Sequence, residues 1–245
     1  MEVHAHTHTA RKKWTHYFWE FLTLFLAVFC GFLAEYQLEH KIEKAREKQY
    51  IRSFIEDLEA DTSSLNDRIS FCELTIARVD SPVAVLNDPK LNEMAGEIYY
   101  FLRWMHRSDV FSINDKTIVQ LRNAGGMRLV SNKNVSDSMI SYYKEVELIG
   151  FVYEEQIEFR RSLRPYFPKL LDGNDYAKAA DERNIVIRPV EPVKLRSADP
   201  EAINAILLIL NNIKAMNKGL KRRTENLKVR AMNIREFILN EYHMK

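Results

Sequence analysis

Three histidines that alternate near the start of the chain are the residues best suited to binding a metal ion. His4, His6 and His8 lie in a polar, His-rich tail of residues 1–13. Neutral imidazoles are common ligands of zinc, copper and nickel. The neighbouring sequence offers no rigid frame and no convincing fourth ligand, so incidental binding or none is the favoured interpretation. These histidines are therefore weak metal candidates, and we expect no cofactor.

Glu20 is the second candidate, because it is an acid near the start of an otherwise apolar run. An acid inside a membrane is costly and often functional, so Glu20 could carry protons in an accessory subunit of an ion-driven membrane machine. The alternative is a structural role. Glu20 lies three residues after Tyr17, where it can reach lipid headgroups, His16 or Lys13, or pair across an oligomer. Its place near the end of the run favours the structural role.

Aromatic residues in two helical patterns could line the ligand pocket of a helical-bundle sensor. Aromatics at helical spacing more often fill a core, and a tail of 13 residues cannot hold an output domain. The residues concerned are Tyr99, Tyr100, Phe101, Trp104, Tyr142, Tyr143 and Phe151.

Two basic groups could bind lipid headgroups or an anionic partner, although such runs are usually solvated faces of a bundle. They are Arg160, Arg161 and Arg164, and Lys221, Arg222, Arg223, Lys228 and Arg230.

Signatures of catalysis are absent from the sequence. It contains no HExxH, P-loop, GxSxG, CxxC or GxGxxG motif. The net charge of +2 does not indicate a nucleic-acid partner. The two cysteines, Cys30 and Cys72, are placed where they cannot sensibly pair. We therefore expect a protein that is not an enzyme, with no nucleic-acid partner and no identifiable small-molecule substrate.

The apolar run from Phe18 to Tyr36 is just long enough to cross a hydrocarbon core of about 30 Å. At 100° per residue its polar and small residues share one arc of about 100°, and bulky side chains cover the rest. Lipid favours the bulky side, while small residues let another helix approach. We therefore predict a membrane anchor over residues 14–36 that has a helical partner. The predicted interface consists of Glu20, Thr23, Ala27, Cys30, Gly31 and Ala34.

A cleaved signal peptide and a core helix of a soluble protein are the alternatives to an anchor. The cations Arg11, Lys12 and Lys13 resemble a signal n-region, but Phe29 and Phe32 occupy the −3 positions where cleavage needs small residues. The same cations favour a cytoplasmic N-terminus and a periplasmic domain, although cations interleaved with acids also follow the run. We therefore predict a single-pass protein of the bacterial inner membrane in that orientation.

Two heptad seams follow the anchor, far apart in the sequence. The first consists of Ile51, Ile55, Leu58, Thr62, Leu65, Ile69, Cys72, Ile76 and Val79. The second consists of Ile203, Ile206, Leu210, Ile213, Asn217, Leu220, Thr224, Leu227, Ala231, Ile234 and Ile238. The seams could pack against each other within a bundle, or could form a coiled coil between chains, and the two possibilities are not exclusive. A core asparagine such as Asn217 would help to fix the register.

Local signals give the remaining boundaries. Residues 80–92, with Pro82 and Pro89, predict a connection after the first long helix. Within that helix a kink is expected at 61–64. Helices are predicted over 92–106 and 115–123, with Gly125-Gly126 allowing positive φ after the second. Asn134 is the expected N-cap of a helix that ends near Leu163. Asp199-Pro200-Glu201 predicts the start of the last helix.

The fold class predicted from these patterns is all-α. A single N-terminal transmembrane helix continues into a long helical stalk and a helical-bundle domain over 37–245. Within that domain, residues 165–200 are rich in proline and predict an irregular segment. The segment wraps over the surface as far as residue 198, and a long helix over 199–241 follows it. Residues 185–195 look extended, with one or two short strands possible, but prolines exclude a central strand.

The chain resembles a family of uncharacterised single-span membrane proteins of Bacteroidota, a domain of unknown function. The resemblance rests on the His-rich start, on Glu20 with LFLAVFCGFLAE (24–35), on EKQYIRSFIEDLEADT (47–62) and on QLRNAGGMRLVSN (120–132). It covers the N-terminal two-thirds of the chain. It implies an envelope location and a helical domain, and it supplies no reaction or site residue.

The expected function is therefore that of a membrane-anchored interaction or scaffold protein of the bacterial cell envelope. It would assemble through its span and its heptad-patterned helices, as a homo-oligomer or as a subunit of a larger membrane-protein complex. The ion-driven machine and the ligand sensor are the alternatives.

Overall fold

The computed structural model describes residues 14–105, 111–123 and 125–244, and the regular structure in these ranges is helical. The predicted all-α class is confirmed. Two isolated antiparallel bridges, Leu171 with Leu195 and Ala180 with Val186, are the only β pairing of the described residues. The expectation of one or two short strands near 185–195 is thus met only by these bridges. The chain divides into two units, residues 1–50 and residues 51–245.

Helix α1 extends from Trp14 to Leu86 and carries the apolar run in its first part. The expected connection at 80–92 begins later than predicted, because Pro82 lies inside the helix. A proline removes only its own N–H from the hydrogen-bond ladder, and burial of Leu86 (4% exposed) favours one further turn. Asn87 then ends the helix by donating its side-chain amide to the Val83 carbonyl (2.7 Å). The expected kink at 61–64 is helical as well.

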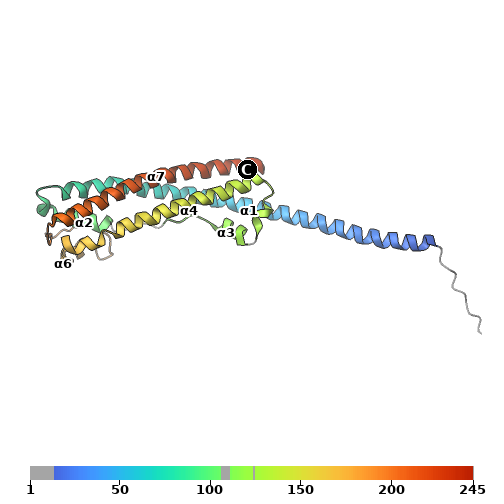
Figure 1. Cartoon of the computed structure of the whole chain (residues 1–245), viewed down its shortest axis with the longest axis horizontal. Coiled ribbons are helices and arrows are strands. Elements are labelled where there is room, and N and C mark those ends of the chain that lie inside the picture. The colour runs from blue at the N-terminus through green and yellow to red at the C-terminus, as the bar shows by residue number, and fades with distance from the viewer. Residues whose placement is uncertain (1–13, 106–110, 124, 245) are drawn as a thin grey trace, which may run out of the picture. The chain divides into compact units, whose positions relative to one another are not determined.

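Three long helices run side by side through the second unit: α1 from Ile51 onward, α4 (Lys133–Arg161) and α7 (Pro200–Glu241) (Figure 1). Ion pairs fix α7 antiparallel to α1. Lys221 pairs with Glu73 at 2.8 Å, Arg235 donates its Nε to Glu59 at 2.7 Å, and Lys214 pairs with Asp80. The two heptad-patterned helices therefore pack together within one chain.

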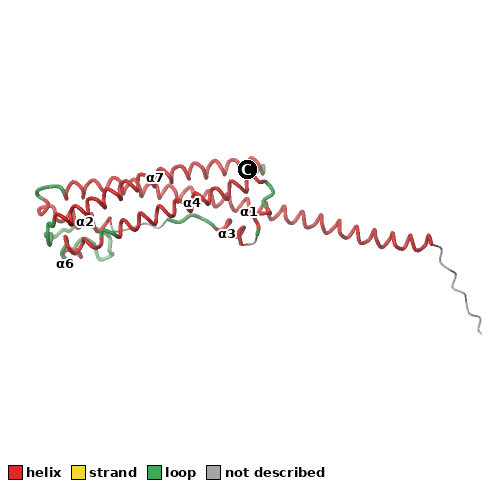
Figure 2. The backbone as a smooth tube through the Cα atoms, in the orientation of Figure 1, coloured by secondary structure: helices red, strands yellow, loops and turns green. Residues whose placement is uncertain are grey.

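The fourth side of this bundle is formed by separate segments: α2 (Ala95–Met105), a loop over 111–115, and α3 (Lys116–Asn123) (Figure 2). It runs opposite to α1. Trp104 stacks on Phe71 with ring centroids 6.3 Å apart, and further along the chain the Thr117 N–H donates to Asp57. A short 3-10 turn, η1 (Leu91–Met94), precedes α2, so the helix begins three residues later than the predicted start at 92.

Helix caps agree with the sequence at two ends and differ at one. Asp199 caps α7 by accepting from the Glu201 N–H, with Pro200 at the first position, as predicted. Gly125 has φ +59°, the left-handed conformation expected after α3, and η2 (Gly126–Leu129) follows it. The expected cap Asn134 is wrong. Asn132 caps α4 instead, because its side chain accepts from the Asn134 and Val135 N–H groups at 3.0 and 3.3 Å.

The Pro-rich region contains three short helical segments, η3 (Arg164–Tyr166), α5 (Phe167–Leu170) and α6 (Gly173–Ala177), joined by irregular chain. The hydroxyl of Tyr99 ties this region to α2. It donates to the Lys194 carbonyl (2.8 Å) and accepts from the Asp172 N–H (2.7 Å). Arg103 adds a hydrogen bond to the Tyr176 carbonyl at 2.6 Å. This part of the chain is therefore held by specific polar contacts to α2.

Candidate functional sites: the uncovered face of α1 and the polar layers of the bundle

The first part of α1 contains one segment long and apolar enough to cross a membrane, and none of it is buried by the chain. Its large side chains stack along the helix. The ring centroid of Phe25 lies 6.2 Å from that of Phe21, one turn earlier, and 6.0 Å from that of Phe29, one turn later. The six residues of the predicted interface are all exposed: Glu20, Thr23, Ala27, Cys30, Gly31 and Ala34. The partner of this face stays a prediction.

Gly31 shows that the small side of the span has no neighbour within the described chain. A Cβ added at this position would meet no atom within 4 Å. Glycine costs helix stability by roughly 1 kcal/mol relative to alanine, so an uncovered glycine gains nothing from its own chain. Its value here would lie in the close approach of another helix.

Glu20 lies beside a basic residue of its own helix. Its carboxylate is 3.3 Å from His16 Nε2, one helical turn earlier, and both side chains are about half exposed. His16 is one of the partners that the structural interpretation of Glu20 names. The geometry supports a local pair at the end of the span rather than a buried proton carrier.

The heptad seams lie inside the second unit. In the first seam, Ile51, Ile55, Leu58 and Leu65 are buried and Ile69 is half-buried. In the second seam Ile203 is half-buried, and the buried residues are Ile206, Leu210, Ile213, Asn217, Leu220, Thr224, Leu227, Ala231, Ile234 and Ile238. Both seams are therefore used within a single chain.

The buried stripe of α1 is broader than the predicted seam and rotated from it. One heptad line of the prediction, Leu58, Leu65, Cys72 and Val79, is fully buried, whereas Thr62, Ile69 and Ile76 of the other are half-buried. The second buried line is one residue earlier in each repeat: Phe54, Asp61, Arg68, Thr75 and Pro82. A bundle helix faces two neighbours and buries a wider stripe than a two-stranded coiled coil does. Polar residues at three of these five positions hid the line from a search for apolar spacing.

Asp57 and Asp61, one turn apart on α1, hold the start of α3. Asp61 accepts from the Asn114 N–H (2.7 Å) and the Tyr142 hydroxyl (2.8 Å), and Asp57 accepts from the Thr117 N–H (3.1 Å). Both acids are nearly inaccessible, at 0% and 5% exposure for Asp61 and Asp57. Carboxylates near a helix N-terminus satisfy N–H groups that lack partners within the helix. This layer therefore joins α1, α3 and α4.

Burial raises the pKa of Asp61 to about 6, with the hydrogen bonds from Asn114 and Tyr142 opposing the rise and the nearby Asp57 and Asp115 adding to it. The pKa values of the Tyr142 and Tyr143 hydroxyls are raised as well, chiefly by burial. Between about pH 3.8 and 6 the folded chain thus binds a proton at Asp61 more tightly than the unfolded chain does.

Replacing Asp61 with asparagine is expected to change how stability depends on pH. Because the folded-state pKa is raised, the wild-type free energy of unfolding should fall as pH rises through the window from 3.8 to about 6. The free energy of unfolding of Asp61→Asn, measured in urea, should not show this fall. Relative to the wild type, it should therefore rise by about 2–3 kcal/mol between pH 4 and pH 7. The exposed Asp67→Asn on the same helix is the control. If the free energy of unfolding depended on pH in the same way in the wild type and in Asp61→Asn, the pKa of Asp61 would not be raised by folding.

A second polar layer lies further along the bundle and contains two buried arginines. Arg160 of α4 is 1% exposed, which corrects the expectation that Arg160, Arg161 and Arg164 form a solvated group; the other two are exposed. Arg160 donates to the Met105 carbonyl (2.9 Å) and to Thr75 Oγ1 (3.1 Å). In the amide orientation that suits its neighbours, Gln156 accepts from Arg160 Nε (3.1 Å) and Asn217 Nδ2 (2.8 Å).

Arg68 of α1 is the other cation of this layer and is 2% exposed. Its Cζ lies 4.1 Å from the ring centroid of Tyr153 and 5.3 Å from that of Phe71. Burial and repulsion from Arg68 lower the pKa of Arg160 to about 10, so the Arg160 guanidinium stays charged at neutral pH. The core of this bundle therefore carries two positive charges in one layer.

The basic run on α7 pairs with the other long helices. Lys221 contacts Glu73 of α1 and Glu225 of its own helix, and Arg230 lies 3.8 Å from Glu145 of α4 and contacts Ser141. Arg222 and Arg223 are exposed. The run thus behaves as the solvated bundle face that the sequence favoured.

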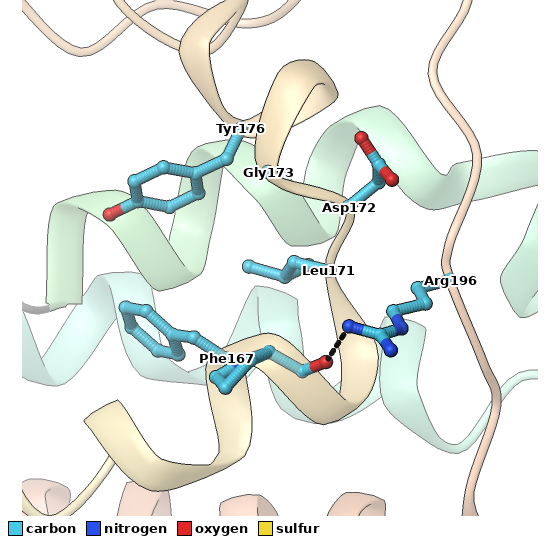
Figure 3. A pocket seen from close by; sticks show the side chains of 7 residues that line it. Phe167, Leu171, Asp172, Gly173, Tyr176 and Arg196 are labelled. Carbon is cyan, nitrogen blue, oxygen red and sulfur yellow. Dashed lines mark hydrogen bonds between the residues drawn. The ribbon is translucent and has the colours of Figure 1, made fainter.

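A pocket of about 310 Å³ opens where the Pro-rich region folds over itself (Figure 3). Phe167, Leu171 and Tyr176 give it apolar walls, and Arg196 and Asp172 supply its polar groups. Both polar groups are already engaged: Arg196 donates to the Pro168 carbonyl (3.2 Å), and Asp172 caps α6. The pocket offers no convergent polar set, and we assign it no ligand.

The aromatics proposed for a sensory pocket do not line this one. Tyr142 is buried against Phe54 and Tyr143, Trp104 lies between Phe71 and Arg78, and Phe151 is 73% exposed. The histidines His4, His6 and His8 lie outside the described residues. Within the residues that are described, no group of three metal-ligating side chains comes together.

No family model, curated protein or solved structure matches this chain. The resemblance to the Bacteroidota family therefore stays a prediction from the residues that carry it.

Proposed function

We propose that this protein is a membrane-anchored helical interaction protein of the bacterial cell envelope that associates with a second copy of itself through its span. The observation that carries the proposal is the small-residue side of α1. It is uncovered by the described chain, and at Gly31 it leaves open space where a side chain could have been. Small residues on one side of a span favour close helix approach.

Because the heptad seams are buried within the chain, they are not available for contacts between chains. The expected function used both the span and the heptad-patterned helices, but the seam residues are largely engaged inside the chain, with Leu65 and Leu210 both at 0% exposure. A buried seam has no apolar surface left to offer to a partner. Of these two patterned surfaces on the described residues, the span is the one that the chain leaves uncovered.

A second copy is the partner that fits this face best. An interface between two parallel copies places the same residues of each span opposite one another, so Gly31 meets Gly31 and neither side adds bulk. The His16–Glu20 pair lies on the same side as Gly31 and can exchange partners across such an interface. We further propose the inner membrane as the location, with the Arg11–Lys13 tail in the cytoplasm and the bundle in the periplasm.

Native mass spectrometry of the full-length chain, extracted in mild detergent, tests the proposal. We expect a dimer or a higher homo-oligomer that persists when the detergent is exchanged. A strictly monomeric particle with no co-purifying protein would refute self-association. A complex that contains one copy of this chain and a different membrane protein would replace the second copy with that protein.

A further inference from the structure

The small-residue side of the span continues along α1 into the neck, which we define as residues 35–48 and which lies in the first unit. At 100° per residue, Leu38, Ile42 and Ala45 lie within about 40° of Gly31 around the helix. All three are exposed, with Leu38 at 60% and Ile42 at 43%. An apolar stripe on a helix is normally covered by another element, so this line of side chains suits a neighbouring helix.

Charged residues of opposite sign lie on the two flanks of this stripe. Measured from Gly31, the acidic flank lies about 40–120° to one side, and the basic flank lies about 80–140° to the other. Arg46 lies on the acidic side and offsets one of its charges. The acidic flank consists of Glu35, Glu39 and Glu43, and the basic flank consists of Lys41, Lys44 and Lys48, all of them exposed.

The charges of the two flanks are not matched along the helix itself. Residues four apart lie one turn above each other, so Glu39 follows Glu35 and Lys48 follows Lys44 with the same sign of charge. Like charges at this spacing destabilise an isolated helix. The ion pairs formed by the described part of the chain include no member of either flank. Both flanks therefore have charge to offer to a partner.

A second copy of this chain matches both flanks at once. Two copies anchored in one membrane lie parallel, because both spans enter it in the same orientation. When a two-fold axis along the helices relates the two copies, opposite flanks meet, so the acidic flank of each copy faces the basic flank of the other. An antiparallel pair would bring like flanks together. The charge pattern thus favours a second copy in the parallel orientation.

We propose that the neck is a second contact surface between two parallel copies of this chain, in which the stripe of Leu38, Ile42 and Ala45 packs on its counterpart and the flanks pair across it. This proposal rests on the self-association of the span and adds a salt-sensitive contact beyond the apolar run. Charges at the edge of a contact set partner and orientation more than affinity. The neck therefore fixes the parallel orientation and the register of the two copies.

Cross-linking of a cysteine placed in the neck tests the proposal, in membranes that contain the full-length protein. Leu38→Cys is made in the Cys30→Ser background, where the remaining cysteine is the buried Cys72. We expect oxidation with copper phenanthroline to give a disulfide-linked dimer. His40→Cys in the same background is the control, because residue 40 is exposed about 160° from Leu38 and should give at least about tenfold less dimer.

Reversal of one flank at a time tests the charge pairing. Two reversed chains are made in the Leu38→Cys protein: one carries Glu35→Lys, Glu39→Lys and Glu43→Lys, and the other carries Lys41→Glu, Lys44→Glu and Lys48→Glu. Each chain alone then has two flanks of one sign, so the yield of dimer at low salt should fall about fivefold. The two purified chains, mixed in mild detergent, should link to each other, because each faces flanks of the opposite sign.

The disulfide of Cys30 in the wild type reports on the span separately, so the two proposals can fail independently. A dimer through Cys30, with equal yields from Leu38→Cys and His40→Cys, would leave the contact of the spans in place and overturn the contact of the necks. No dimer from either Cys30 or Leu38→Cys would refute self-association as a whole. If Leu38→Cys links but the mixed reversed chains do not, the pairing of the flanks is overturned.

Discussion

Replacing Leu65 with alanine should lower the free energy of unfolding of the bundle by about 2–5 kcal/mol, the usual cost of removing a fully buried leucine. Leu65 is 0% exposed and lies on the heptad line of α1 that is fully buried. The matched control is Leu74→Ala on the same helix. Leu74 is 42% exposed, so its replacement should change stability by about 0.5 kcal/mol or less.

The same measurement separates packing within a chain from packing between chains. The seam of α1 packs against α7 of its own chain, so the unfolding midpoint of Leu65→Ala should not depend on protein concentration. If the seam held two chains together, dilution would lower the midpoint in the wild type and in the variant. A small effect at Leu65, equal to that at Leu74, would contradict the internal seam.

Replacing Gly31 with leucine should abolish most of the self-association of the span. The added side chain would occupy the space through which a second helix approaches, while the span stays fully apolar. We expect the dissociation constant of the complex to rise at least tenfold, which corresponds to about 1.4 kcal/mol. Native mass spectrometry over a range of protein-to-detergent ratios measures the change.

Phe32→Leu is the matched control for Gly31→Leu. It places the same side chain at the next residue, about 100° around the helix and on the side built for lipid. The variant should associate as the wild type does. Equal losses in both variants would indicate general disturbance of the span, and no loss in Gly31→Leu would remove Gly31 from the interface.

The long apolar patterns of this chain were enough to predict its helices. Seam residues such as Leu58 and Leu210 repeat at heptad spacing because their helices bury one stripe, and burial follows that spacing closely in α7. The start of α7 was also predictable, since Asp199-Pro200-Glu201 satisfies the first N–H groups of the helix through local chemistry alone. A helix cap depends on residues that are adjacent in the sequence, and a buried stripe depends on a single repeat spacing, so the sequence is sufficient to predict both.

The polar layers could not be predicted in the same way. Charged residues are almost never fully buried unless they are paired, so Arg68 and Arg160 were assigned no place in the core, and Asp61 was assigned to a kink. Their partners are distant in sequence: Tyr142 is 81 residues from Asp61, and Thr75 is 85 residues from Arg160. One signal was available. Asp61, Arg68 and Thr75 are spaced by seven and lie beside the apolar line of Leu58 and Leu65.

The helix ends that differed have local causes that compete closely. Asn132 and Asn134 are both good N-caps, and the earlier one is used because its side chain reaches two N–H groups. Pro82 would ordinarily end a helix, yet the burial of Leu86 four residues later favours continuation. In both cases the sequence offered two acceptable answers: local capping decided the start of α4, and the burial of Leu86 favours the longer α1.

The thiol of Cys30 gives the most direct test of self-association through the small-residue side of the span. Cys30 is exposed on that side, whereas Cys72 is buried in the bundle and has a pKa raised by that burial, which makes it unreactive. Membranes that contain the full-length protein are treated with copper phenanthroline and analysed on non-reducing gels. Cys30→Ser gives the background.

The companion variant moves the thiol to the lipid side. Cys30→Ser combined with Phe29→Cys keeps one cysteine at the same depth but about 150° from the centre of the small-residue arc. We predict a disulfide-linked dimer for the wild type and none for either the single or the double variant. Absence of a dimer in the wild type, or equal dimer from Phe29→Cys, would contradict the proposed interface.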